Sequence, residues 1–144
     1  MIKTNSSKFS RDLSKIEKQV DKKIDEAVLE TARRGKDLEK EHLLRNGSIQ
    51  TQKLYNSINY TIKNKRKAII GPMMKEAYPQ YIEKGRGPVY PKHTKALRFT
   101  INGKTVFAKS VGPAKARPFV HPTWVELRTE YPYIMEKKIN EALK

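Results

Sequence analysis

Cysteine is absent from the 144 residues of this chain, and this absence removes several classes of site at once. Without a thiol the chain cannot form a disulfide, a zinc–thiolate site or a cysteine nucleophile. The lack of thiols agrees with assembly in a reducing compartment, where disulfides are rare. A chain of this length is the usual size of one domain and can bury a core without such links. We therefore expect a single domain, residues 1–144, in which the polar residues 1–7 are flexible.

Long apolar runs are also missing from the sequence. No stretch approaches the roughly 20 consecutive apolar residues that a membrane-spanning helix needs. Residues 1–20 carry charged side chains throughout, so no signal peptide is expected there. The sequence therefore predicts a protein without a membrane partner.

Acidic residues are scarce in one part of the chain. Residues 42–125 hold 16 basic residues and only two acidic ones, Glu76 and Glu83, which gives a net charge of +14. Residues 1–41 carry 11 basic and 9 acidic residues, and residues 126–144 carry four of each. A concentrated positive field attracts polyanions, whether nucleic acid or an acidic protein surface. The alternative is that the excess of lysine only keeps the protein soluble.

The N-terminal segment has the periodicity of a long helix. Apolar residues from Phe9 to Val28 recur at steps of three and four, which places them on one face. Ser6 or Ser7 is suited to cap the start, and Asn46-Gly47 is a stop signal. Two uses of the apolar stripe stay open: an oligomer surface, or a cover for the chain's own sheet.

Two later segments have the alternation of β-hairpins. Residues 58–62 and 68–71 read as strands joined by the polar turn "KNKRK". Residues 96–111 hold a second hairpin, in which Asn102-Gly103 is suited to a type I′ turn. Phe107 falls on the polar side of its strand, so we expect a neighbouring element or subunit to cover it.

Helical patterns separate and follow the hairpins. Short helices are expected over residues 51–57 and 77–82, and a closing helix begins near Pro122. Pro132 interrupts the apolar stripe of that closing helix and should kink or split it. The order of elements predicts an α+β fold, in which an antiparallel sheet of about four strands from the two hairpins is flanked by the long helices.

Catalytic constellations are not recognisable. His42, His93 and His121 have no metal-ligand spacing, and "GRG" at residues 85–87 lacks the residues of a phosphate-binding loop. Glu76 and Glu83 are seven residues apart; such a pair can hold Mg²⁺ in a nuclease, but a third ligand is missing. We favour a structural use of Glu83, as an anchor for a cation or a cap for a turn. We therefore expect no enzyme activity, no metal site and no cofactor.

The stretch "EKGRGPVYPKHTKALR" at residues 83–98 is the most cationic loop of the chain. Of the nearby rings, we expect Tyr78, Tyr81 and Phe99 to be core and Tyr90 to be exposed. No helix carries a dense basic face, so sequence-specific reading of duplex DNA is not expected.

Four sequence segments, in order, resemble a known family. They are "TQKLYNSI" (51–58), "AYPQYIEKGRGP" (77–88), "KALRFTINGKTVFAKSV" (95–111) and "ARPFVHP" (116–122). The chain is similar here to the tail-completion proteins of long-tailed bacteriophages, whose pattern is Leu-x-x-Ser-Ile, Tyr-x-x-Glu-x-Gly, Ala-Leu-x-Phe, Gly-Lys and Ala-Arg-Pro-Phe. One departure is that Tyr81 stands one residue closer to Glu83 than in that pattern. The resemblance covers residues 51–144, and the first helix agrees in position only.

The resemblance implies a structural, non-enzymatic virion protein. Such proteins form a ring, commonly a hexamer, that ends the tail tube and joins it to the neck of the head. The implied partners are further copies of the chain, the tail tube protein, a neck or head-completion protein and, without sequence specificity, the passing viral DNA. The implied location is the head–tail junction of the virion, after assembly in the host cytoplasm.

The resemblance also suggests which side chains line the channel or dock onto a neighbouring ring. The candidate cations are Lys84, Arg86, Lys92, Lys95, Arg98 and Lys104, and the candidate inter-subunit or core apolar residues are Phe99, Phe107, Phe119 and Trp124. A head-side adaptor ring is the closest competing function. A free, non-specific DNA-binding protein is less favoured, and a nuclease that uses Glu76 and Glu83 is the least favoured.

Overall fold

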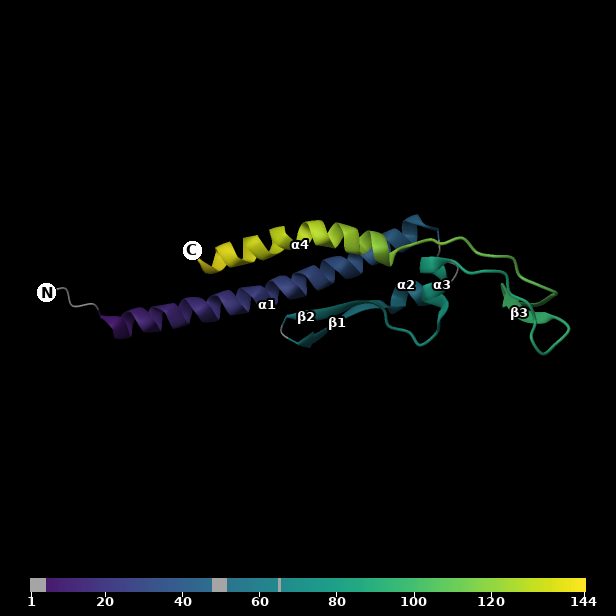
Figure 1. Ribbon diagram of the computed structural model, residues 1–144, viewed down its shortest axis with the longest axis horizontal. Coiled ribbons are helices and arrows are strands. Elements are labelled where there is room, and N and C mark those ends of the chain that lie inside the picture. Colours follow the sequence, from purple (N-terminus) through teal and green to yellow (C-terminus); the bar gives the residue numbers. More distant parts are fainter. Residues whose placement is uncertain (1–4, 48–51, 65) are drawn as a thin grey trace.

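The computed structural model describes residues 5–47, 52–64 and 66–144 of the chain. Its elements in order are α1 (Ser6–Arg45), α2 (Gln52–Ser57), β1 (Ile58–Asn64), β2 (Lys67–Pro72), α3 (Tyr78–Lys84), β3 (Leu97–Ile101), β4 (Lys104–Ala108) and α4 (Val120–Ala142). Figure 1 shows an elongated molecule, in which α1, α4 and the β1–β2 hairpin form a body and β3–β4 lies at the far end. No helix of the described segments is long and apolar enough to cross a membrane.

The first helix starts and stops at local signals. The side chain of Asn5 accepts a hydrogen bond from the Lys8 N–H at 3.2 Å, so Asn5 is the cap. The expectation that Ser6 or Ser7 caps the helix is wrong, because both residues already lie in its first turn. At the other end, the N–H of Asn46 bonds the carbonyl of His42 at 3.0 Å. Residues 1–4 of the segment expected to be flexible lie outside the described residues.

The body is built on an antiparallel pair of helices. In Figure 1, α4 runs back along one side of α1 while β1 and β2 lie along the other. Arg34 of α1 pairs with Glu130 of α4 at 2.9 Å, and Lys23 pairs with Glu141 at 3.2 Å. Partly exposed pairs of this kind contribute little to stability. They nevertheless show that the two helices are antiparallel, because the later residue of α4 pairs with the earlier residue of α1.

Apolar burial is concentrated in the second half of α1 and its neighbours. A cluster of buried side chains comprises Leu43, Leu54, Ile58 and Phe119. Two turns earlier in α1, the side chains of Ile70 and Leu127 lie close to the backbone of Gly35. A Cβ built on Gly35 would lie 2.6 Å from Ile70 Cδ1 and 2.8 Å from Leu127 Cδ1. The glycine thus lets both β2 and α4 approach α1 at the same place.

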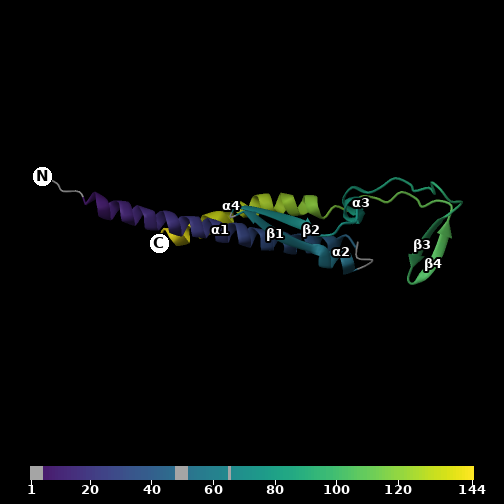
Figure 2. The same ribbon diagram turned by 90° about the horizontal axis from the view of Figure 1, so that it is seen from below.

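The two hairpins form separate sheets. Ile58 pairs with Pro72 across β1 and β2, and Leu97 pairs with Ala108 across β3 and β4. Asn102 and Gly103 have φ of 49° and 78°, as a type I′ turn requires. Both predicted hairpins are therefore confirmed, as is the α+β class. They do not join into one sheet of four strands within the described chain, because β3–β4 lies away from the body (Figure 2).

The closing helix continues through its internal proline. Pro122 lies in the first turn, as expected, and α4 then runs without a break from Val120 to Ala142. The expectation that Pro132 splits the helix is therefore wrong. A kink at Pro132 stays a prediction, because proline removes one N–H donor from the helical ladder.

Buried leucine on α1 should carry a measurable part of the stability. Leu38 is fully buried, whereas Leu44, on the same helix, is 52% exposed. Leu38→Ala is expected to lower the free energy of unfolding by about 2–5 kcal/mol, because it leaves a cavity in the core. Leu44→Ala is the matched control, with an expected change within about 0.5 kcal/mol. Urea unfolding measures both, and equal losses would contradict this packing of α1.

Candidate functional site

A paired segment of chain carries β3–β4 away from the body, and we call residues 84–118 the arm (Figure 2). Its two sides are held together by reciprocal backbone hydrogen bonds. Arg86 and Ala114 exchange two bonds of 3.0 Å, and Val89 and Val111 exchange two of 2.8 and 2.9 Å. These bonds satisfy backbone groups on both sides. The stretch that reads as a loop in the sequence is therefore paired at Arg86 and Val89, while residues 90–96 form neither a strand nor a bridge.

The root of the arm is closely packed around a glycine. Gly85 has φ of 74°, and a Cβ there would lie 2.7 Å from the carbonyl oxygen of Ala114 and 2.8 Å from the nitrogen of Ala116. A side chain at residue 85 is therefore excluded by both conformation and space. Next to it, the N–H of Arg117 donates to the carbonyl of Ile82 at 2.7 Å, which joins the arm to α3.

The charge of the arm has one sign only. Residues 84–118 contain nine basic residues and no acidic one. The six cations expected at a channel or docking surface all lie here, with Lys84 and Arg86 near the root and Arg98 and Lys104 on the hairpin. In the described part of the chain, no carboxylate pairs with any cation of the arm.

The cations are spread along the arm instead of meeting at one point. Lys92 and Lys95 are exposed and lie between the root and the hairpin. Arg86 differs from the others, because its guanidinium donates to the carbonyls of Gly87 and Gly112 at 3.2 and 3.1 Å. Arg86 therefore also closes its own ribbon, while the exposed lysines are available to an anion.

The four candidate apolar residues have different environments. Phe119 is fully buried and belongs to the core. The expectation that Phe99 is core is wrong, because Phe99 is half-buried beside Val106 on the β3–β4 hairpin, away from the core cluster. Phe107 is 66% exposed and Trp124 is 60% exposed, on β4 and on α4 respectively. Both rings are therefore mostly uncovered within the described chain.

The rings of α3 are not core, contrary to expectation. Tyr78 and Tyr81 are 37% and 50% exposed, because α3 is a short helix whose half-buried Ile82 alone packs against the core cluster. Their spacing predicts an apolar face correctly, but no element of the described chain lies over that face. Tyr90 is 63% exposed, as expected.

The carboxylate of Glu83 joins the arm root to α4. It accepts hydrogen bonds from the backbone N–H groups of Phe119, Val120 and His121 at 2.8, 2.9 and 2.9 Å. These N–H groups have no partner within the helix, and a negative charge there is favourable. A structural use of Glu83 is therefore confirmed, although Glu83 caps the start of α4 and neither anchors a cation nor caps a turn.

The second acid of the nuclease hypothesis has a different partner. Glu76 forms an ion pair with Lys53, next to α2. Across the described residues, no group of three or more potential metal-ligating side chains could hold an ion.

A second carboxyl close to the arm root was missed by sequence analysis. Glu39 of α1 is 2% exposed, and its Oε2 has no hydrogen-bond partner among the described residues. Burial raises the pKa of Glu39 to about 7, and the negative charge of Glu83 adds to the rise. A signal was present: Gly35, Glu39 and Leu43 follow one another at steps of four, so Glu39 lies on the buried face.

A contact between α1 and α4 was also missed. His42 Nε2 lies 2.9 Å from Glu126 Oε1. These residues are 84 positions apart, so no local pattern could relate them.

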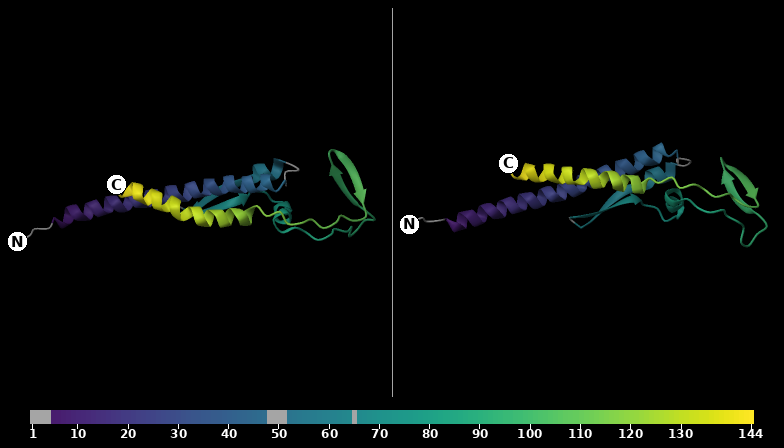
Figure 3. Two further views of the ribbon diagram at one scale, coloured as in Figure 1. Left: turned by 90° about the horizontal axis from the view of Figure 1, so that it is seen from above. Right: turned by 45° about the horizontal axis from the view of Figure 1, so that its top comes forward.

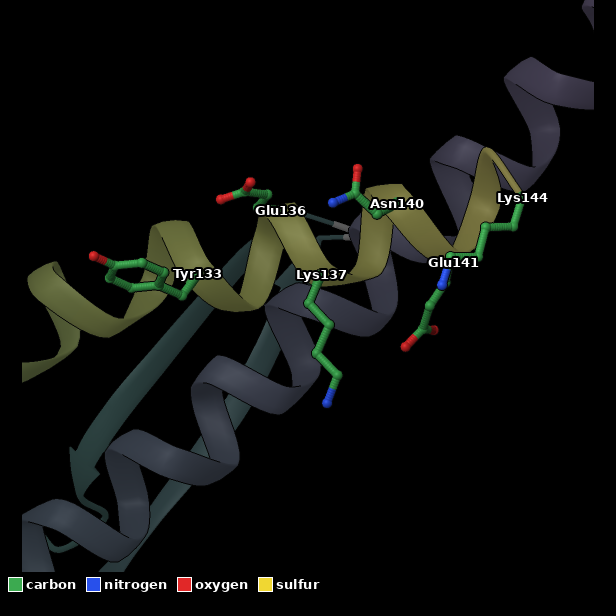
Figure 4. Close-up of a pocket in the computed structure, with 6 residues that line it drawn as sticks. All are labelled: Tyr133, Glu136, Lys137, Asn140, Glu141 and Lys144. Carbon is green, nitrogen blue, oxygen red and sulfur yellow. The ribbon is translucent and has the colours of Figure 1, made fainter.

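A surface hollow at the end of α4 does not form a site. Figure 4 shows its lining side chains, which are Tyr133, Glu136, Lys137, Asn140, Glu141 and Lys144. Five of them come from α4 and Lys144 follows its end, and they point in different directions instead of toward a common centre. The arm is therefore the stronger candidate for a functional surface.

Glu83→Gln should destabilise the junction of arm and body. An amide keeps the size of the side chain but loses the charge that strengthens three bonds to backbone N–H groups. We expect the free energy of unfolding to fall by about 1–2 kcal/mol, as for loss of a helix cap. Glu76→Gln is the matched control, with an expected change below about 1 kcal/mol, since its ion pair is exposed. Urea unfolding near pH 5 keeps Glu39 protonated in both variants, and equal stabilities would contradict the capping role.

Glu39 should make stability depend on pH. As the pH rises, Glu39 keeps its proton up to about pH 7 in the folded chain but loses it near pH 4.5 in the unfolded chain. Protonated Glu39 therefore stabilises the folded chain. This contribution is complete below pH 4.5 and is lost as the pH rises through about 7. Glu39→Gln is therefore expected to raise the free energy of unfolding by roughly 2–3 kcal/mol at about pH 9 and to change it little at about pH 4.5. Glu41→Gln, on the exposed face of α1, should leave the pH profile unchanged.

Comparison of the chain with protein-family models, curated proteins and solved structures finds no match. The use of the arm is therefore inferred from its own chemistry: a hydrogen-bonded ribbon with unpaired positive charge and uncovered aromatic rings.

Proposed function

We propose that the chain is a structural protein of a long-tailed bacteriophage, which forms a ring that ends the tail tube and joins the tail to the head. The observation that carries this proposal is the arm, a built projection with nine basic residues and no acidic one. Among the described residues, no carboxylate pairs with a cation of this projection, so it is suited to an assembly in which neighbours meet it. The order of the sequence motifs shared with the tail-completion family agrees with this role.

The cations of the arm are suited to a DNA channel. Lysine and arginine side chains offset the repulsion between phosphates and a protein wall without reading bases. Lys92, Lys95 and Lys104 are exposed and have no ion pair in the described chain, so they remain available to phosphates. The same side chains are equally suited to an acidic surface of the tail tube or neck. In either case the arm recognises charge and not sequence.

A ring also explains why the two hairpins are separate in one chain. An isolated two-stranded hairpin is marginally stable in water, and its edges invite further strands. We propose that β3–β4 extends the sheet of a neighbouring subunit, so that four strands form between copies. Phe107 would then be covered by that neighbour.

Two other functions account for part of the same observations. A head-side adaptor ring would carry the same arm but stay with the head, so imaging of unattached tails separates it from a tail terminator. A free DNA-binding protein would use the arm as a monomer. This alternative predicts that the purified chain binds DNA with micromolar affinity and that the affinity falls steeply with salt concentration.

Assembly of virions tests the proposal directly. Without this protein, we expect full heads and tails that do not join, seen by electron microscopy, because the connecting ring is missing. Restoring a chain with Lys92→Glu, Lys95→Glu and Lys104→Glu should lower the yield of joined particles at least about tenfold, since repulsion replaces attraction.

The matched control carries Lys22→Glu, Lys75→Glu and Lys137→Glu, three exposed lysines outside the arm. It changes the net charge equally and should restore joining. If particles without the protein still join heads to tails, the proposal is wrong.

A further inference from the structure

The N-terminal part of α1 extends beyond the rest of the body. In both views of Figure 3, the helix continues past the C-terminal end of α4. The last contacts of α4 are made near Lys23, which pairs with Glu141 at 3.2 Å, and Ala142 is buried there. Residues 6–19 of α1, which we call the tip, are exposed throughout.

The tip carries an apolar stripe. Phe9, Leu13 and Ile16 are 66%, 50% and 43% exposed. At 3.6 residues per turn these three residues lie within about 60° of one another around the helix axis. A stripe this narrow is typical of a helix that packs against another surface.

The charges around the stripe are segregated. On the same helical geometry, Asp12 flanks the stripe on one side and Glu17 on the other. The basic residues Arg11, Lys15 and Lys18 lie on the opposite face. A surface that receives this stripe should therefore be apolar, with cations along its edges.

The body has a groove of this composition. It lies where β2, α4 and α1 meet and has a volume of about 370 Å³. Its lining includes Val28, Ile70, Leu127, Trp124 and Tyr131. Trp124 and Tyr131 are 60% and 40% exposed, so the groove is open to a partner.

Two arginines are part of the groove's lining. Arg66 comes from the β1–β2 hairpin and Arg128 from α4. Arg66 pairs with Asp21 of its own α1. Arg128 is exposed and has no ion pair with a described residue. The groove is thus apolar and positively charged, whereas the stripe is apolar and negatively flanked.

We propose that the tip of one copy docks into the β2–α4 groove of the next copy. The stripe covers Trp124 and Tyr131, and the carboxylates of Asp12 or Glu17 meet Arg128. The contact joins two different surfaces, so repeated copies close into a ring when the rotation permits. This inference rests on the proposed ring function and names one of its interfaces.

Two other arrangements are disfavoured by geometry and charge. The tip cannot fill its own groove, because Leu13 and Val28 are on one continuous helix and about 22 Å apart along its axis. Two tips cannot pair well with each other, because acidic residues would flank both stripes and repel across the seam. The β3–β4 hairpin is a poorer occupant of this groove, since the cations of the arm would meet Arg128.

Cross-linking tests the contact cleanly, because the chain has no cysteine of its own. The full chain is prepared as two single variants, Leu13→Cys and Trp124→Cys, which are mixed over a series of concentrations and treated with a short bismaleimide. We expect a covalent dimer that contains one of each variant, identified by mass spectrometry. Lys18→Cys, on the opposite face of the tip, replaces Leu13→Cys in the matched control and should give at least about tenfold less product, since it faces away from the groove.

Charge exchange provides a second measurement on the same contact. Glu17→Arg and Arg128→Glu are each expected to weaken association about five- to tenfold in sedimentation velocity, and the two together should restore it to within about twofold. Both residues are exposed, and circular dichroism checks that each variant remains folded.

Several outcomes would overturn the inference. They are dimers of Leu13→Cys with itself as the main product, equal yields with Lys18→Cys, no association at any concentration, or no rescue by the double charge exchange. If rings form in electron micrographs while the cross-link fails, the docking inference is wrong and the ring function stands. If the cross-link forms but particles without the protein still join heads to tails, the interface stands and the function is wrong.

Discussion

The cap that Glu83 places on α4 is the interaction on which the layout of the molecule depends. Its carboxylate sits at the end of α3, directly before the arm, and holds the backbone N–H groups that begin α4 directly after the arm. Both ends of residues 84–118 are therefore tied at one point. Because Gly85 allows close backbone contact at the same place, the arm leaves the body as a paired ribbon.

Charge divides the molecule into two parts with different physical roles. Most ion pairs of the described chain join residues of α1 to α4, to the β1–β2 hairpin or to α1 itself. Outside the arm the chain holds 22 basic and 15 acidic residues, so the positive charge there is partly balanced by carboxylates. On the arm it is not balanced, and electrostatic attraction to an anion remains available. The body is suited to packing between copies, and the arm to an anionic partner.

Glu39 is a buried carboxyl group close to the point where the arm joins the body. A buried carboxyl without a hydrogen-bond partner favours its neutral form, and the charge of Glu83 reinforces this preference. The negative charge that caps α4 thus adds to the effect of burial, which is the main cause of the raised pKa of Glu39. Glu39 lies on α1 and Glu83 on α3, beside the residues that begin α4.

Prediction from the sequence succeeded where the cause is local. Asn102-Gly103 and the alternation around it determine the second hairpin, and the spacing from Phe9 to Val28 determines a helix, because both depend on neighbours within a few residues. It failed for Tyr78 and Tyr81, because an apolar face is buried only if some other element reaches it. It failed for Glu39, because a polar residue on a buried face goes against average composition.

By itself, the sequence determined the helices, the hairpins, the absence of cysteine chemistry and the segregation of positive charge, since each follows from composition or short-range periodicity. The tertiary structure decided which surfaces are used. It paired the second half of α1 with α4 and left the tip of α1 uncovered, although the apolar stripe is continuous. It also placed Glu83 at the start of α4, 36 residues away in sequence from Phe119. Such contacts depend on how distant segments of the chain pack against each other, and no short stretch of residues determines that packing.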